Sequence, residues 1–217
     1  MEPWHAYGGD VRISDMVLKG TTTIGVVCKD GVIMATDTRA TMGYFVAHKR
    51  AKKVFSIDDH LGMTIAGAVA DAQTVVEILR ANAKLYKYEK GTPMPTKSAA
   101  RLTANLLFSS RYYPLLLQAI VGGVDGEGPK LFALDPLGSL TEERCVSTGS
   151  GSPIAYGVLE AEFRDGMETR EAIPIIVKAI DSAMKRDSAS GDSFDIAVIT
   201  KEGYRELGER EKKGLLA

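Results

Sequence analysis

Short, almost continuously apolar segments joined by glycine-containing turns constrain the fold of this chain more than any other feature. Residues 22–37 hold two apolar runs, which are separated by Lys29, Asp30 and Gly31. Asp-Gly is a strong tight-turn signal, because glycine accepts a positive φ without steric cost. This pattern predicts an antiparallel hairpin, since parallel neighbouring strands need a long crossover between them.

The same pattern recurs along the chain and alternates with helical segments. Three further hairpins are predicted, with turns at residues 58–62, 126–129 and 201–203. Apolar residues at helical spacing predict four helices. The first two cover residues 72–86 and 96–107, and the other two start near Ser152 and near Thr169. Thr96 is a candidate helix cap, and Pro174 is expected to distort the first turns of the last helix.

The resulting order is strands, two helices, strands, two helices and strands, with no internal linker or short repeat. Strands such as residues 31–35 and 196–199 are apolar throughout, which is typical of sheets covered on both faces. The chain is therefore predicted to be an α+β protein, a four-layer α/β/β/α sandwich with two packed sheets and helices on both outer faces. A doubly wound sheet is the alternative, and the hairpin turns disfavour it.

The charge balance gives no general reason to expect nucleic acid or an anionic membrane as partner, because 27 Lys and Arg face 28 Asp and Glu. The single basic run, residues 48–53, is interpreted as a solvated face. No segment approaches the length of a membrane span. Residues 1–20 hold Glu2 and Asp10 and lack a continuous apolar block, unlike a signal peptide. We therefore expect a soluble, cytoplasmic protein.

Familiar metal and nucleotide motifs are missing from the sequence. Cys28 and Cys145 lie far apart and fit no metal-ligand spacing. Cys28 is expected to be a buried, inert thiol in a reducing compartment, and the three histidines are interpreted as surface residues. Residues 149–153 offer backbone N–H groups to an anion, but without a P-loop ending they are better explained as a tight turn.

Three threonines, Thr21, Thr22 and Thr23, follow Gly20 where the first apolar strand begins. One interpretation is an ordinary strand start after a tail, because threonine suits an extended backbone. The other is a cut after Gly20, which would leave Thr21 with a free α-amine beside its own hydroxyl, a self-contained nucleophile and base. Thr22 and Thr23 are interpreted as ordinary strand residues in both cases.

Two charged residues punctuate the apolar strands: Asp37 ends the second predicted strand and Lys53 begins another. Carboxylates and ammonium groups are rarely buried unless paired, so a structural ion pair accounts for these two residues by themselves. Together with Thr21 they form a set of a hydroxyl, a lysine that holds the local proton balance and a carboxylate that orients the lysine. The residues alone leave both interpretations open.

Four separated motifs resemble the β-type subunits of the archaeal 20S proteasome, and they occur in that family's order. They are GTTTIGVVCKDGVIMATDTRAT from Gly20, MTIAGAVADAQ from Met63, STGSGSPIAYGVLE from Ser147 and MKRDSASGD from Met184. The resemblance implies the N-terminal nucleophile hydrolase fold. It also implies that residues 1–20 are a propeptide removed by self-processing and that residues 21–217 are a single catalytic domain.

The resemblance implies a threonine endopeptidase with a role for each matching residue. Thr21 matches the nucleophile freed by cutting the Gly20–Thr21 bond, and its own amine would move the proton through water. Asp37 and Lys53 match the acid–lysine pair beside it, although some archaeal relatives carry glutamate at the position of Asp37. Gly67 matches the glycine whose N–H stabilises the oxyanion. The residues that match the polar support around the threonine are Ser150, Asp187 and Ser190.

The pocket that receives the side chain before the cut is implied to be lined by small or apolar residues, namely Ala40, Ala51, Ile65 and Val69. Such a lining predicts cleavage after large apolar residues. The resemblance implies no metal and no organic cofactor.

The family works as a chambered particle. This implies homo-heptameric β rings stacked in pairs between proteasome α-type rings, with unfolded protein supplied by a regulatory ATPase. Two alternatives remain. A noncatalytic ring subunit would not need the full set of site residues, and a small-molecule amidase with the same threonine chemistry would not need the motifs outside the site.

Overall fold

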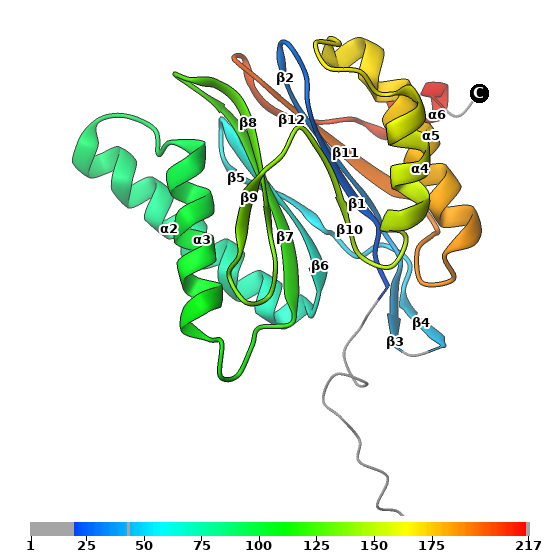
Figure 1. The fold of residues 1–217 in the computed structure, drawn as a ribbon, viewed down its shortest axis with the longest axis horizontal. Coiled ribbons are helices and arrows are strands. Elements are labelled where there is room, and N and C mark those ends of the chain that lie inside the picture. Colours follow the sequence, from blue (N-terminus) through cyan, green and yellow to red (C-terminus); the bar gives the residue numbers. More distant parts are fainter. Residues whose placement is uncertain (1–19, 43, 216–217) are drawn as a thin grey trace, which may run out of the picture.

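Figure 1 shows the computed structural model of the chain, which describes residues 20–42 and 44–215. The predicted propeptide lies outside the described residues except for Gly20, as does His5. Two sheets lie face to face in the centre of the molecule, and a pair of helices lies beyond each sheet. The predicted four-layer α/β/β/α sandwich is therefore confirmed.

Both sheets are built from antiparallel neighbours throughout the described residues. The first sheet consists, in spatial order, of β10 (Cys145–Thr148), β1 (Thr23–Val27), β2 (Gly31–Asp37), β11 (Phe194–Thr200) and β12 (Gly203–Glu206). The second consists of β5 (Val54–Asp58), β6 (Leu61–Gly67), β7 (Leu117–Asp125), β8 (Gly128–Leu134) and β9 (Leu140–Glu142). This pairing excludes the doubly wound alternative.

Four helices cover the outer faces of the sheets. The second sheet is covered by α2 (Val69–Lys90) and α3 (Thr96–Ser109), and the first sheet by α4 (Ser152–Glu162) and α5 (Thr169–Arg186). All four correspond to helices that the apolar spacing predicts. Helix α5 continues through Pro174 to its end at Arg186. Its N-terminus is capped by reciprocal hydrogen bonds between Glu168 and Glu171.

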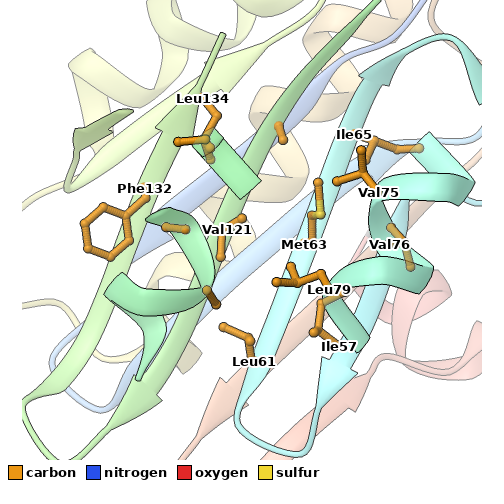
Figure 2. Close-up of a cluster of buried hydrophobic side chains, with 14 of the residues drawn as sticks. Ile57, Leu61, Met63, Ile65, Val75, Val76, Leu79, Val121, Phe132 and Leu134 are labelled. Carbon is orange, nitrogen blue, oxygen red and sulfur yellow. The ribbon is translucent and has the colours of Figure 1, made fainter. Parts of the chain in front are cut away.

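Buried apolar side chains fill each of the three spaces between the four layers. Figure 2 shows the cluster between the second sheet and its helices, where Met63 of β6 lies near Leu79 of α2 and Phe132 lies farther along the sheet. A second cluster, which includes Ile24 and Ile180, lies between the first sheet and α4 and α5. A third lies between the two sheets. Burial on both faces explains why the strands are apolar along their whole length.

Glycine allows the two sheets to approach closely. A Cβ atom at Gly25 of β1 would lie 3.0 Å from both Ile120 and Leu131 of the opposite sheet. A Cβ at Gly122 of β7 would lie 3.0 Å from Val32 across the same space. These distances are shorter than ordinary van der Waals contacts, so larger residues there would push the sheets apart.

Several short elements were not predicted from the sequence. They are a hairpin of β3 (Ala40–Met42) and β4 (Phe45–His48), the edge strands β9 and β10, and the helix α6 (Glu209–Leu215). Each is too short to show a reliable periodicity.

Two predictions about individual side chains were wrong. Thr96 is not the cap of α3, because Pro95 holds that position and Oδ2 of Asp125 accepts the Thr96 N–H at 2.8 Å. The carboxylate of Asp125 at the end of β7 therefore caps the N-terminus of α3. His60 is not a surface residue: it is half-buried, and its Nε2 lies 2.8 Å from the carbonyl oxygen of Met94.

Both cysteines are free, with Cys28 buried and Cys145 half-buried. Burial raises the pKa of each thiol to about 12, so both remain protonated at neutral pH. Within residues 20–42 and 44–215, none of the helices combines the length and the apolar character that crossing a membrane requires.

Candidate active site

Thr21 lies between Gly20 and the start of β1, and only 5% of its surface is exposed. Its Oγ1 donates a hydrogen bond of 2.5 Å to the carbonyl oxygen of Gly20. Its N–H reaches Oγ of Ser150 at 3.4 Å, and its carbonyl accepts the N–H of Gly151 at 3.3 Å. The hydroxyl is thereby held beside the peptide bond that the sequence predicts to be cut.

Asp37 and Lys53 form a buried ion pair, with 2.8 Å between Oδ1 and Nζ. Asp37 is the last residue of β2 and Lys53 directly precedes β5, so both lie at the same end of the packed sheets as Thr21. Asp37 also accepts the N–H groups of Thr22 at 2.9 Å, Arg39 at 3.0 Å and Gly191 at 3.1 Å. Four donors therefore fix the position of this carboxylate.

Burial opposes charge on both members of the ion pair. It lowers the pKa of Lys53, and the negative charge of Asp37 acts in the opposite direction. Burial likewise raises the pKa of Asp37, while Lys53 and the N–H groups of Thr22 and Gly191 act the other way. A lysine whose pKa is lowered can exchange a proton at a pH closer to neutral, as proton transfer from a hydroxyl requires.

Lys53 also reaches the bond before Thr21. Its Nζ donates to the carbonyl oxygen of Gly20 at 3.2 Å and to that of Arg39 at 2.5 Å. The Gly20 oxygen thus accepts hydrogen bonds from both Lys53 and Thr21. Donors directed at a carbonyl oxygen stabilise the negative charge that develops there during nucleophilic attack.

A second carboxylate, Asp187, lies at the C-terminal end of α5. Its Oδ2 accepts hydrogen bonds from the hydroxyls of Ser150 and Ser190, both at 2.6 Å, and its Oδ1 accepts the N–H of Ala189 at 3.2 Å. Since Ser150 also contacts the N–H of Thr21, Asp187 is linked to the candidate nucleophile through one serine.

Thr22 joins the two carboxylates into one network. Its N–H binds Asp37, and its Oγ1 lies 2.8 Å from Oγ of Ser190. The hydrogen bonds form a closed path through Thr21, Ser150, Asp187, Ser190, Thr22, Asp37, Lys53 and Gly20. The structure therefore brings together six of the seven predicted catalytic residues, and Thr22, interpreted from the sequence as an ordinary strand residue, lies inside the network.

The seventh, Gly67, lines a cavity of about 310 Å³ beside Thr21. Gly67 ends β6 with a φ of 138°, and a Cβ there would lie 2.0 Å from the carbonyl oxygen of Leu116. The four predicted pocket residues, Ala40, Ala51, Ile65 and Val69, all line the same cavity.

Sequence reasoning missed further residues at the site. Arg39 and Gly191, which bind Asp37, stand within two of the four motifs, so motif membership was the signal that could have found them. The cavity wall also includes His48, Lys52, Phe55 and Gln73. Gln73 could have been found from its spacing, because it lies four residues after the predicted pocket residue Val69 in α2 and therefore on the same helix face.

A larger cavity of about 690 Å³, lined by Lys29, Tyr204 and Arg205 among others, lies at the other end of the sheets. It holds none of the predicted site residues.

The sequence of this chain is similar to those of known proteins along most of its length. The profile of a family described as "Proteasome subunit" matches residues 17–199, a span that includes every residue of the network. The chain is 49% identical to the proteasome subunit beta of Methanosarcina mazei over 201 residues, which cover 92% of this chain and 96% of the relative. It is 53% identical to the proteasome subunit beta of Methanocaldococcus vulcanius, covering 92% and 90%.

Proposed function

Because the chain belongs to the proteasome subunit family, we propose that it is a threonine-type endopeptidase, the catalytic β-type subunit of a proteasome core, with Thr21 as nucleophile. The observation that carries this proposal is the position of the Thr21 hydroxyl, 2.5 Å from the Gly20 carbonyl oxygen that Lys53 also contacts. A hydroxyl, a lysine and a carboxylate are grouped around one peptide bond, as nucleophilic catalysis requires.

The first reaction of this site is on its own chain. The oxygen of Thr21 attacks the carbonyl carbon of Gly20, the bond from that carbon to the Thr21 nitrogen breaks, and an ester forms. The hydroxyl proton ends on the Thr21 nitrogen, which becomes an amine, and Lys53 supports the charge that builds on the Gly20 oxygen. Water then hydrolyses the ester, so residues 1–20 leave with a carboxylate end and Thr21 becomes the first residue.

The mature site cleaves peptides by the same chemistry. The free amine of Thr21, acting through water, takes the hydroxyl proton, and the oxygen attacks the carbonyl carbon of the substrate. The bond from that carbon to the peptide nitrogen breaks, the nitrogen receives the proton and leaves as an amine, and an acyl-enzyme ester remains on Thr21. The ion pair of Asp37 and Lys53 holds the local proton balance, and Gly67 supplies an N–H to the oxyanion. Removal of one such donor costs ~10²–10³ in rate in other enzymes. Hydrolysis of the acyl-enzyme ester by water regenerates Thr21.

The cavity beside Thr21 is the proposed site for the substrate side chain that precedes the cut. Its volume of about 310 Å³ is large enough for any amino-acid side chain, and the predicted lining residues are small or apolar. Burial of an apolar side chain there adds binding energy that a charged side chain would forfeit by desolvation.

The proposed assembly into rings follows from the reactivity of the threonine. A threonine that attacks any extended peptide would damage other proteins if it were freely accessible, and a closed ring removes it from them. Cyclic symmetry is a common way for copies of one chain to close on themselves. We therefore propose homo-heptameric rings stacked in pairs, with α-type rings and a regulatory ATPase as partners and unfolded protein as substrate.

Two other functions fit the site less well. A noncatalytic ring subunit has no use for a buried lysine placed on the carbonyl before Thr21. A small-molecule amidase has no need for similarity to proteasome subunits along more than nine tenths of the chain.

The test is the mass of the subunit after assembly. The full chain is co-expressed with an α-type partner, and particles are separated by size and analysed by intact mass and peptidase activity. Wild-type protein should begin at Thr21, Thr21→Ala should keep residues 1–20 and lack activity, and Thr23→Val should behave like wild type. Fully active particles that retain residues 1–20 would refute the nucleophile. Monomers as active per subunit as the particle would refute sequestration in a ring.

A further inference from the structure

We propose that Thr22 is a positioning residue of this site, which anchors the nucleophile through its backbone to Asp37 and through its hydroxyl to Asp187. The inference rests on the proposed function, in which Thr21 becomes the first residue of the mature chain. It assigns a purpose to a buried hydroxyl that the chemistry described above does not use.

A newly formed chain end needs an anchor. Terminal residues fray unless contacts tie them down. The ladder of β1 begins at Thr23, so Thr22 is the one residue between the nucleophile and the sheet. The backbone contacts of Thr21 itself, to Ser150 and Gly151, are long at 3.4 and 3.3 Å. Thr22 is therefore the position from which a terminal Thr21 can be held in place.

The backbone of Thr22 makes a reciprocal pair of hydrogen bonds with Asp37. The N–H of Thr22 donates to Oδ1 of Asp37 at 2.9 Å, and its carbonyl accepts the N–H of Asp37 at 3.1 Å. Neither bond involves Gly20, so both persist after the cut. They tie the position of Thr21 to the carboxylate that orients Lys53.

The hydroxyl of Thr22 has a defined direction. Ser190 has one hydroxyl proton and donates it to Oδ2 of Asp187, so across the 2.8 Å contact Thr22 is the donor and Ser190 the acceptor. This chain of hydroxyls ends on a carboxylate, and both hydroxyl-bearing residues are fully buried, where successive hydrogen bonds polarise one another. Asp187 also holds Ser150, which contacts the nitrogen of Thr21.

Gly151, in the loop before α4, leaves space for the Thr22 hydroxyl because it has no side chain. A Cβ atom on Gly151 would lie 2.0 Å from Oγ1 of Thr22. Any side chain at this position would displace the hydroxyl from Ser190. The N–H of the same glycine donates to the carbonyl of Thr21, so one residue both contacts the nucleophile and leaves room for its anchor.

The experiment compares hydroxyl and methyl at Thr22 in assembled particles formed from the full chain and an α-type partner. Thr22→Val removes the hydroxyl and keeps the shape, and Thr22→Ser keeps the hydroxyl. Thr23→Val is the matched control, because Thr23 is also fully buried but its hydroxyl bonds to Thr148, outside the network. The measurements are kcat and KM for a fluorogenic peptide, the extent of processing by intact mass, and the unfolding temperature.

We expect Thr22→Val to lower kcat about tenfold with little change in KM, since the loss of one buried hydrogen bond misplaces the nucleophile without altering the pocket. Thr22→Ser should recover most of kcat, and Thr23→Val should match wild type. The role is overturned if Thr22→Val has wild-type kcat, or if Thr22→Ser is as slow as Thr22→Val at equal unfolding temperature. If the valine variant does not assemble, the comparison of Thr22→Ser with Thr22→Ala, which differ by one oxygen, decides in the same way.

Failure of the proposed function gives a different result. If particles of the Thr21→Ala variant were active, Thr21 would not be the nucleophile, and the anchoring role of Thr22 would be refuted with it. An inactive Thr21→Ala particle together with a fully active Thr22→Val particle would reject only the role of Thr22.

Discussion

The side-chain nitrogen of Lys53 lies 3.2 Å from the carbonyl oxygen of Gly20, the residue directly before Thr21. In the uncut chain the lysine therefore contacts the group that the threonine is proposed to attack, while its other bonds hold it to Asp37 and to the backbone of Arg39. In the proposed mechanism, a substrate carbonyl takes the place of the Gly20 carbonyl after the cut. The same lysine is thus placed to serve both self-processing and peptide hydrolysis.

Replacement of Lys53 by alanine is expected to abolish both reactions. The variant loses the donor to the Gly20 oxygen and leaves Asp37 buried without its cation, so peptide hydrolysis should fall by at least ~10²-fold. Lys49→Ala is the control, because the Lys49 side chain is exposed in the same basic run. Activity and intact mass are measured on particles of equal size. Full activity of the Lys53 variant would contradict its assigned role.

The pH dependence of the Asp37→Asn variant tests how the ion pair works. Burial lowers the pKa of Lys53 and the charge of Asp37 raises it, so removal of that charge should lower the pKa further. Lys53 supports the negative charge on the carbonyl oxygen in its protonated form, and that form is lost as the pH rises through the pKa of Lys53. The alkaline limb of kcat/KM should therefore move to lower pH in the variant, at a reduced maximum. A limb that stays in place or moves to higher pH would argue against a role for protonated Lys53.

Gly67→Ala is expected to damage the site through the backbone. A φ of 138° is strained for any residue with a side chain, and the new Cβ would meet the carbonyl oxygen of Leu116 at 2.0 Å. We expect the free energy of unfolding to fall by about 1–3 kcal/mol, with loss of activity as the N–H at this position turns away. Gly126→Ala is the control, since a Cβ atom at Gly126 would have no neighbouring atom within 4 Å. If the two substitutions lowered stability and activity equally, the assigned role of Gly67 would be contradicted.

The composition of the cavity predicts specificity. The wild-type protein should cleave after large apolar residues, and a peptide library read by mass spectrometry would display this preference. Val69→Arg adds a cation to the cavity wall at a position that is 40% exposed, so the fold should tolerate it. Cleavage after acidic residues should rise about tenfold relative to apolar ones, whereas Val69→Leu should keep the wild-type profile. An unchanged profile in the arginine variant would reject the assigned pocket.

The sequence was sufficient for the main elements of the fold. Glycines in the turns marked the hairpins, for two different physical reasons. Gly128 and Gly203 have φ values of 102° and 122°, which residues with a side chain rarely adopt. Gly31 has no positive φ, but a Cβ atom there would lie 2.3 Å from the carbonyl oxygen of Ile199. Apolar spacing marked the four long helices, since a helix that covers a sheet must present one apolar face. The motifs around Thr21, Asp37 and Lys53 pointed to the site through resemblance, while the residues by themselves left a structural ion pair as an open alternative.

Only the tertiary structure decided how these parts meet. Strands such as β3 and β9 have three residues each and acquire their conformation from their neighbours. Thr22 and Ser190 are 168 residues apart in the sequence and 2.8 Å apart in space, and nothing local in either segment predicts that contact. The cavity beside Thr21 likewise draws its wall from several elements. Local propensity acts within a few residues of chain, whereas burial and hydrogen bonding between strands and loops act across the whole chain. These long-range contacts placed Thr22 within the hydrogen-bond network around Thr21.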